Sequence, residues 1–163
     1  MNVIDEAGIL ALSTRLQRLS DRIRKDGLEI YREMGISFEP KWFPVIYVLH
    51  KKNVLSVVEI ANEIGYTHPS TITLLKELEK EKIIRSKKDK ADERKRLLQL
   101  STKGQQLIDQ MGPAWEVITA ATADLINTQN NLMQAILEVE EQLKMKSFLQ
   151  RALVLIKERQ DSA

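Results

Sequence analysis

The sequence predicts a mainly α-helical chain with one small β-ribbon. In several long segments of the 163 residues, apolar side chains recur every three or four positions, which is the helical period. Two short segments, 83–88 and 96–100, can each form a strand, and the polar run 89–95 between them suits the tip of a hairpin. We therefore expect helices that surround and flank a two-stranded ribbon.

Residues 55–81 predict two short helices joined by a tight turn. Four apolar residues of the first helix have helical spacing before Gly65: Val57, Ile60, Ala61 and Ile64. Thr67 can cap the second helix, in which Pro69 is tolerated only within the first turn. Two short helices that meet at a glycine turn form a helix-turn-helix, and a ribbon after them makes a winged helix.

The second of these helices has an apolar face and a polar face. We expect it to bury Ile72, Leu75 and Leu78. The residues expected to face outward are Ser70, Thr71, Thr73, Lys76 and Lys80. Because the second helix of a helix-turn-helix usually lies in the DNA major groove, the polar face is predicted to contact a duplex.

Residues 92–104 resemble the wing signature of the MarR family of transcriptional regulators. The shared features are Asp92, Arg94 two residues later, an alternating apolar strand that ends at Leu100, and a closing Gly104. The resemblance implies a winged helix-turn-helix at 35–104, a helical dimerisation region at 1–34 and 105–163, and a homodimer. It also implies that Arg94 enters the minor groove of DNA while Asp92 holds its guanidinium.

These considerations give a set of candidate DNA-contacting residues: Thr67, His68, Ser70, Thr71, Thr73, Lys76, Lys87, Lys88, Asp92, Arg94, Lys95 and Arg96. Two positions depart from the family pattern. Glu93 stands where relatives often have a second arginine, and Lys82 stands where they usually have a glycine in a left-handed turn. A dimer of winged helices would require a pseudo-palindromic operator.

The distribution of charge agrees with a nucleic-acid partner. Residues 82–96 contain eight basic and three acidic side chains, whereas residues 105–147 contain six acids and two lysines. One part of the chain is therefore suited to polyanions and another is not.

Long apolar stripes indicate how the ends of the chain are used. A first helix is expected over 5–34, with the stripe Ile9, Leu12, Leu16, Leu19, Ile23, Ile30 and Met34. A helix over 105–121 is expected to be kinked or interrupted at Gly112-Pro113, and a final helix is expected over 132–158 after a turn at 127–131. The stripes suit either a second subunit or an intramolecular pairing of the first and last helices, and the resemblance favours the dimer.

Aromatic residues gather around a connector at 35–40 and a short helix at 41–50. One interpretation is a core helix behind the helix-turn-helix, which fits Phe43 best. The other is a crevice for a small aromatic or anionic effector, lined by Tyr31, Phe38, Trp42 and Tyr47. Trp115 is expected to face either the core or this crevice, and the core is favoured.

Several classes of protein are disfavoured. The chain has no cysteine and only two histidines, so we expect no metal and no cofactor. It has no phosphate-binding loop and no nucleophile motif, which argues against an enzyme. No apolar run is long enough for a membrane span, and we expect a cytoplasmic protein. The alternatives that remain open are a DNA-binding part of a larger protein, for example one with an acetyltransferase domain, and a winged-helix adaptor that contacts only proteins.

Overall fold

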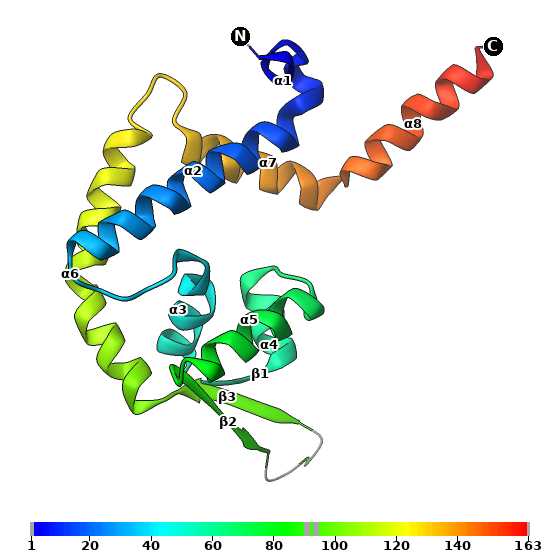
Figure 1. The fold of residues 1–163 in the computed structure, drawn as a ribbon. Helices are drawn as coiled ribbons and strands as arrows, with labels where there is room; N and C mark the ends of the chain where they lie inside the picture. The colour runs from blue at the N-terminus through cyan, green and yellow to red at the C-terminus, as the bar shows by residue number, and fades with distance from the viewer. Residues whose placement is uncertain (1, 90–91, 93–94, 163) are drawn as a thin grey trace. The chain divides into compact units, whose positions relative to one another are not determined.

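The computed structural model describes residues 2–89, 92 and 95–162. The chain divides into two compact units, Met1–Ile118 and Thr119–Ala163. Unit 1 contains α1 (Val3–Glu6), η1 (Gly8–Ala11), α2 (Leu12–Glu33), η2 (Pro40–Trp42), α3 (Phe43–Lys52), β1 (Val54–Ser56), α4 (Val57–Ile64), α5 (His68–Lys80), β2 (Ile84–Lys88), β3 (Arg96–Leu100) and most of α6 (Thr102–Leu125) (Figure 1). Unit 2 contains the end of α6, α7 (Leu132–Met145) and α8 (Phe148–Asp161).

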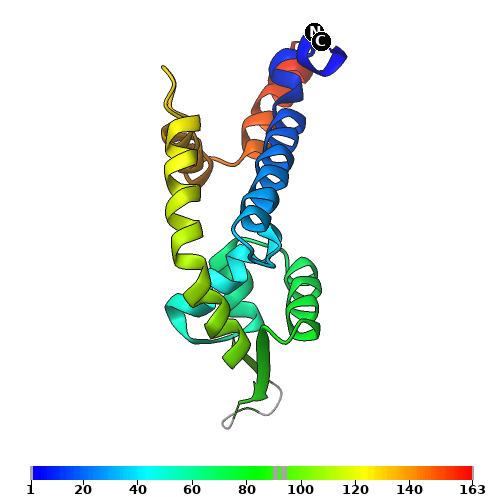
Figure 2. The same cartoon turned by 60° about the vertical axis from the view of Figure 1, so that its left-hand side comes forward.

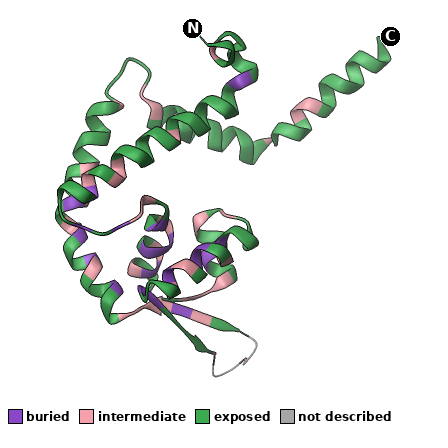
Figure 3. Ribbon diagram, viewed as in Figure 1, coloured by how far each residue is buried: buried purple, intermediate pink, exposed green. Residues whose placement is uncertain are grey.

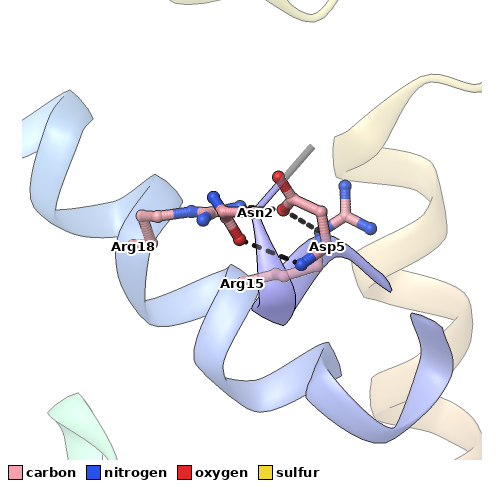
Figure 4. Close-up of polar contacts among 4 residues, drawn as sticks. All are labelled: Asn2, Asp5, Arg15 and Arg18. Carbon is pink, nitrogen blue, oxygen red and sulfur yellow. Dashed lines mark hydrogen bonds and ion pairs between the residues drawn. The ribbon is translucent and has the colours of Figure 1, made fainter. Parts of the chain in front are cut away.

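The N-terminal segment is broken where the sequence predicts one helix over 5–34, and that prediction is wrong. Gly8 has a φ of 58°, a left-handed conformation that ends α1 after a single turn. The Asn2 side chain accepts a hydrogen bond from the Asp5 backbone N–H at 3.0 Å. The Asp5 carboxylate lies 2.5 Å from the Arg18 guanidinium and 4.0 Å from that of Arg15, so α1 folds back against α2 (Figure 4).

The core of unit 1 lies where α3 meets the helix-turn-helix and the start of α6 (Figure 3). Pro40 and Pro44 occupy the first turns of η2 and α3, where a missing N–H costs nothing, so the helix predicted near 41–50 is confirmed. The largest fully buried side chains are Val45, Ile46, Leu49, Ile60, Thr71, Leu75, Leu78, Leu98 and Met111. These residues come from five elements of the unit, and they fix the positions of α4 and α5.

The sheet has one strand more than the predicted ribbon. Its order is β1-β3-β2, with both pairs antiparallel. Leu98 of β3 is opposite Leu55 on one side and Ser86 on the other. The predicted ribbon is confirmed, and in both views its hairpin extends away from the helices of unit 1 (Figures 1 and 2). β1 has only three residues, and its last one, Ser56, also caps α4, so its strand pattern is too short to stand out.

α6 runs through Gly112 and Pro113 as one helix, so of the predicted kink or interruption it is the interruption that is wrong. Proline removes one helical hydrogen bond, here the one to the carbonyl of Asp109. Asp109 is exposed, and water can satisfy that carbonyl. Met111 and Ala114 on either side of the pair are fully buried, and their packing keeps the helix continuous.

In unit 2, the predicted turn at 127–131 follows the end of α6 and is confirmed. The single final helix predicted over 132–158 is wrong, because α7 ends at Met145 and α8 starts at Phe148. Ser147 and Gln150 form a reciprocal capping box that starts a new helix. Neither α7 nor α8 has a buried residue within the described part of the chain, as Figure 3 shows.

Candidate nucleic-acid interface

The N-terminus of α5 is formed by the residues predicted for it. Thr67 has an extended backbone, and its hydroxyl oxygen accepts a hydrogen bond from the Ser70 N–H at 3.4 Å. His68 and Pro69 form the first turn, where proline is tolerated. Gly65 ends α4 with a φ of 69° and so sets the tight turn between the two helices. The helix-turn-helix predicted from the sequence is therefore present.

α5 presents a polar face to solvent. The exposed side chains on it are His68, Pro69, Ser70, Thr73, Lys76 and Lys80. The Thr73 hydroxyl donates a hydrogen bond to the Pro69 carbonyl at 3.0 Å. Short hydroxyl groups and lysines on one helix face are suited to phosphates and base edges.

Thr71 does not belong to this face, and the prediction that it points outward is wrong. Its exposed fraction is 0%, and it lies on the apolar side of α5 with Leu74, Leu75 and Leu78. The hydroxyl donates a hydrogen bond to the Thr67 carbonyl at 3.0 Å. A buried threonine is tolerated here because this local bond satisfies its only polar group. Ile72, predicted to be buried, is only partly so.

The wing carries exposed cations on β2 and at the end of the hairpin. Arg85, Lys87, Lys88 and Lys95 are all exposed. The hairpin is closed by hydrogen bonds from the Asp89 N–H to the Lys95 carbonyl and from the Lys95 N–H to the Asp92 carbonyl. Arg94, predicted to enter the minor groove, lies outside the described residues, as does Glu93.

Two acidic side chains hold α5 in place from opposite sides. The Glu77 carboxylate lies 2.7 Å from the Lys41 ammonium and accepts a hydrogen bond from the Trp42 indole N–H at 2.9 Å. These two contacts lower the pKa of Glu77 below its usual value. On the other side, Glu79 forms an ion pair with Arg96 of β3. Arg96 was predicted to contact DNA, and in the structure its ion pair with Glu79 links β3 of the wing to α5.

The helix also ends in a defined way. Ile83 N–H bonds to the Leu78 carbonyl at 2.9 Å, and Lys82 between them has a φ of 60°. This pattern is a Schellman motif with a lysine at the position that glycine usually takes. The left-handed turn expected at Lys82 is thus confirmed. The Ser101 hydroxyl donates to the Lys82 carbonyl at 2.6 Å, which ties the turn to the start of α6.

The four residues predicted to line an effector crevice fall into two aromatic groups. Tyr31, Phe38 and Trp42 are buried, and they stack edge to face with ring centres 4.8 and 5.8 Å apart. Tyr47 is 39% exposed and stacks on Phe43 at 5.2 Å. Phe43 was predicted to belong to the core, and Trp115 to either the core or the crevice.

Trp115 of α6 connects the aromatic groups. Its ring lies 5.8 Å from Phe43 and 5.7 Å from Tyr47, both edge to face. Burial raises the pKa of the Tyr31 hydroxyl, and the neighbouring Trp115 indole partly offsets the rise. The indole N–H is itself buried and has no acceptor in hydrogen-bonding geometry among the described residues.

Comparison with known proteins gives matches only at the level of structure. No protein-family model matches the sequence. No curated protein matches it either. Solved structures do match: the M. tuberculosis transcriptional regulator MosR in complex with DNA has a TM-score of 0.68 at 16% identity, over 82% of this chain and 96% of that one. The S. aureus MepR–DNA complex gives 0.63 at 19% identity, over 82% and 96%.

A third match is the PcaV transcriptional regulator of Streptomyces coelicolor in complex with its natural ligand. It gives a TM-score of 0.64 at 15% identity, over 90% of this chain and 99% of that one. These neighbours are MarR-family regulators. The chain has the MarR-type winged-helix fold. In the MarR-type fold, the exposed face of α5 and the basic β2–β3 hairpin form one candidate interface.

No helix of residues 2–89, 92 and 95–162 is long and apolar enough to cross a membrane. Within the same part of the chain, no three histidine or carboxylate side chains gather where they could hold a metal ion.

Proposed function

We propose that this protein is a sequence-specific DNA-binding transcriptional regulator that acts as a homodimeric repressor on a pseudo-palindromic operator. The observation that carries the proposal is the face of α5, which presents Ser70, Thr73 and Lys76 to solvent beside a basic hairpin. The MarR-type fold of DNA-bound neighbours supports it. No step of this function requires catalysis.

The homodimer is supported by apolar surface that one chain leaves uncovered. Leu12, Leu16, Leu19 and Ile23 form a stripe along α2, and each is exposed. A stripe of this length on a soluble helix marks an interaction surface. A two-fold dimer would place two α5 helices in successive major grooves, about 34–36 Å apart.

The experiment that tests this function is a selection from genome fragments with the purified protein, followed by titration of the recovered duplexes at two salt concentrations. We expect a pseudo-palindromic site bound by two subunits. Its affinity should fall steeply as the salt concentration rises, because the release of counterions from the DNA then gains less free energy. Recovery of no preferred sequence would support an adaptor, or a role as one part of a larger protein.

Variants refine the test at the level of single residues. Lys76→Ala on α5 and Arg94→Ala on the wing are expected to weaken operator binding strongly. The control is Lys144→Ala in unit 2, where the ammonium pairs with Glu141 at 2.5 Å on an acidic helix. Equal losses in all three variants would refute the assigned DNA-binding face.

A second proposed activity is release of the operator by a small aromatic effector. Phe43 and Tyr47 are each 39% exposed, and their rings pack edge to face against Trp115, whose buried indole N–H makes no hydrogen bond to the described residues. An aromatic ring with a carboxylate or hydroxyl group could stack on Tyr47 and accept a hydrogen bond from the Trp115 N–H.

This activity is tested by titrating aromatic carboxylates while tryptophan fluorescence and operator affinity are measured. Trp42→Phe and Trp115→Phe assign the signal, because the chain has only these two tryptophans. We expect quenching that persists in Trp42→Phe and vanishes in Trp115→Phe. Compounds that change neither fluorescence nor operator affinity would argue against an effector.

A further inference from the structure

A groove of about 300 Å³ lies along one side of α5 and shares Ser70 and Thr73 with the candidate interface described above. It is lined by Arg24 of α2, Lys41 of η2, Tyr66 of the turn before α5, and Ser70, Thr73 and Leu74 of α5. We call it the Arg24 groove. It brings together residues up to 50 positions apart, and sequence analysis assigned neither Arg24 nor Lys41 to any site.

The lining offers hydrogen-bond donors to an oxyanion. The Thr67 hydroxyl donates to the Ser70 oxygen at 2.9 Å, so the hydrogen of the Ser70 hydroxyl is free to donate elsewhere. The Tyr66 hydroxyl has no bonding partner among the described residues. Thr73 is not a donor here, because its hydrogen is used by the Pro69 carbonyl.

The charge of the groove is positive. Arg24 is exposed and forms no ion pair within the described part of the chain, and the lining residues include no carboxylate. Lys41 is held by Glu77 at 2.7 Å, which fixes its ammonium beside the groove and leaves two of its hydrogens unused. A guanidinium without a carboxylate partner is suited to bidentate binding of a phosphate.

The position of the groove suggests where that phosphate comes from. Ser70 and Thr73 belong both to the groove and to the exposed face of α5. When a recognition helix lies in the major groove, a phosphate backbone runs along each of its sides. The wing is attached to one side of α5 through Arg96 and Glu79, whereas Arg24 and Lys41 are on the side of Glu77.

We propose that the Arg24 groove binds one backbone phosphate of the duplex, with the Arg24 guanidinium as the principal ligand and Ser70 and Tyr66 as hydroxyl donors. The proposal rests on the function proposed above and adds a contact from α2, an element outside the winged helix-turn-helix. α5 would then be fixed between two phosphate backbones, one contacted by the wing and the other by α2.

The first test compares the salt dependence of duplex binding for the wild type, Arg24→Gln and Lys25→Gln. Lys25 is the next residue of α2, is exposed and does not line the groove, so it controls for loss of one charge. Each neutralised phosphate contributes about 0.9 to the slope of log affinity against log salt. A homodimer has two grooves, so Arg24→Gln should make the slope shallower by about 1.8, and Lys25→Gln by less than half of that. Equal slopes for the two variants would overturn the proposal.

The second test removes the phosphate instead of the arginine. Single phosphates of the selected duplex are replaced by neutral methylphosphonate. At one position, the neutral substitution should lower the affinity of the wild type. The same substitution should not lower the affinity of Arg24→Gln any further, because this variant already lacks the contact. Additive losses at every position would overturn the proposal.

Free phosphate shares this chemistry, and a titration separates the two sources. Inorganic phosphate is added to the protein without DNA, at constant ionic strength, while backbone amide chemical shifts are recorded. Saturable shifts at Ser70 that disappear in Arg24→Gln would assign the groove to a free phosphate compound and overturn the backbone source. If the wild type bound no duplex with steep salt dependence, the proposed function would fail before this question arose.

Discussion

At the scale of single residues, Lys82 adopts an unfavourable left-handed backbone conformation in the turn after α5. A side chain in the left-handed conformation costs roughly 1–2 kcal/mol relative to glycine. We predict that Lys82→Gly raises the free energy of unfolding by about 0.5–1 kcal/mol, since glycine also gains entropy in the unfolded chain. Urea unfolding of both proteins measures the difference.

The control for this prediction is Lys80→Gly, two residues earlier, at the last residue of the helix. There glycine should lower the free energy of unfolding by up to about 1 kcal/mol. Opposite signs at positions 80 and 82 would confirm that backbone conformation, and not loss of a charge, decides the outcome. A loss of stability at both positions would contradict the prediction.

Glu77 gives the fold a predictable response to acid. Because Lys41 and Trp42 lower the pKa of Glu77, the folded protein holds this proton less tightly than the unfolded chain does. The charged Glu77 side chain stabilises the fold fully at a pH above its pKa in the unfolded chain, which is about 4.3. This stabilisation is lost as the pH falls through the lower pKa of Glu77 in the folded protein. We predict that Glu77→Gln lowers the melting temperature at pH 6–7. The difference in melting temperature between this variant and the wild type should become smaller toward pH 3.

The matched control is Glu81→Gln, an exposed carboxylate just beyond the end of α5. Its removal should leave the melting temperature near that of the wild type throughout the range. A gap between Glu77→Gln and wild type that stayed constant from pH 7 to pH 3 would show that the carboxylate charge contributes nothing.

At the scale of elements, the start of α6 packs directly against the backbone of Ile83, the residue before β2. A Cβ atom at Gly104 would lie 2.1 Å from the carbonyl oxygen of Ile83. Because this neighbour is backbone, it cannot move aside cheaply. We predict that Gly104→Ala lowers the free energy of unfolding by about 1–3 kcal/mol, as measured in urea with an unchanged m-value.

Gly112, in the same helix, supplies the comparison. A Cβ atom there would meet no heavy atom within 4 Å among those described. Gly112→Ala should therefore raise the free energy of unfolding by up to about 1 kcal/mol, which is the helix propensity difference. If both alanine variants changed stability in the same direction, the short distance to the Ile83 carbonyl oxygen would not explain why position 104 needs glycine.

The elements that sequence could predict are those encoded by local signals. The helix-turn-helix has a closing glycine, a capping threonine and a first-turn proline within the five residues 65–69, and all act as expected. The split between α7 and α8 also has a local signal, the capping pair Ser147 and Gln150, but the apolar stripe continues past it and hides it. Continuity of α6 through Pro113 depends on the packing of its neighbours, which no local pattern encodes.

The candidate site was predictable to a similar extent. The polar face of α5 follows from helical periodicity, except at Thr71, a polar residue on the buried side whose hydroxyl is satisfied within its own turn. The contacts that hold α5 join residues far apart in the chain, Trp42 to Glu77 and Arg96 to Glu79. Periodicity carries no information about such pairs, so the sequence did not predict the hydrogen bond from Trp42 to Glu77 or the ion pair of Arg96 with Glu79.

At the scale of the whole molecule, a single chain leaves much apolar surface uncovered. Besides the stripe of α2, exposed side chains of unit 2 include Leu137, Val139, Leu143, Leu149, Leu153 and Ile156. Isolated apolar residues are normal on a protein surface, but rows along whole helices are not. The ends of the chain are therefore the surfaces on which the proposed homodimer depends.

This dependence leads to a prediction for Leu16, which is in the middle of the α2 stripe and is 47% exposed in one chain. Leu16→Glu would place a carboxylate in the apolar contact of each subunit, where burial of an unpaired charge is costly. We expect the dimer dissociation constant to rise at least about 100-fold, equal to about 2.8 kcal/mol, as measured by sedimentation equilibrium. Gln17→Glu introduces the same charge one residue along the helix, off the stripe, and should leave the dimer intact. Operator affinity should fall with dimerisation in Leu16→Glu alone, because two linked recognition helices bind far better than one. A fully dimeric Leu16→Glu would show that the stripe pairs within the chain.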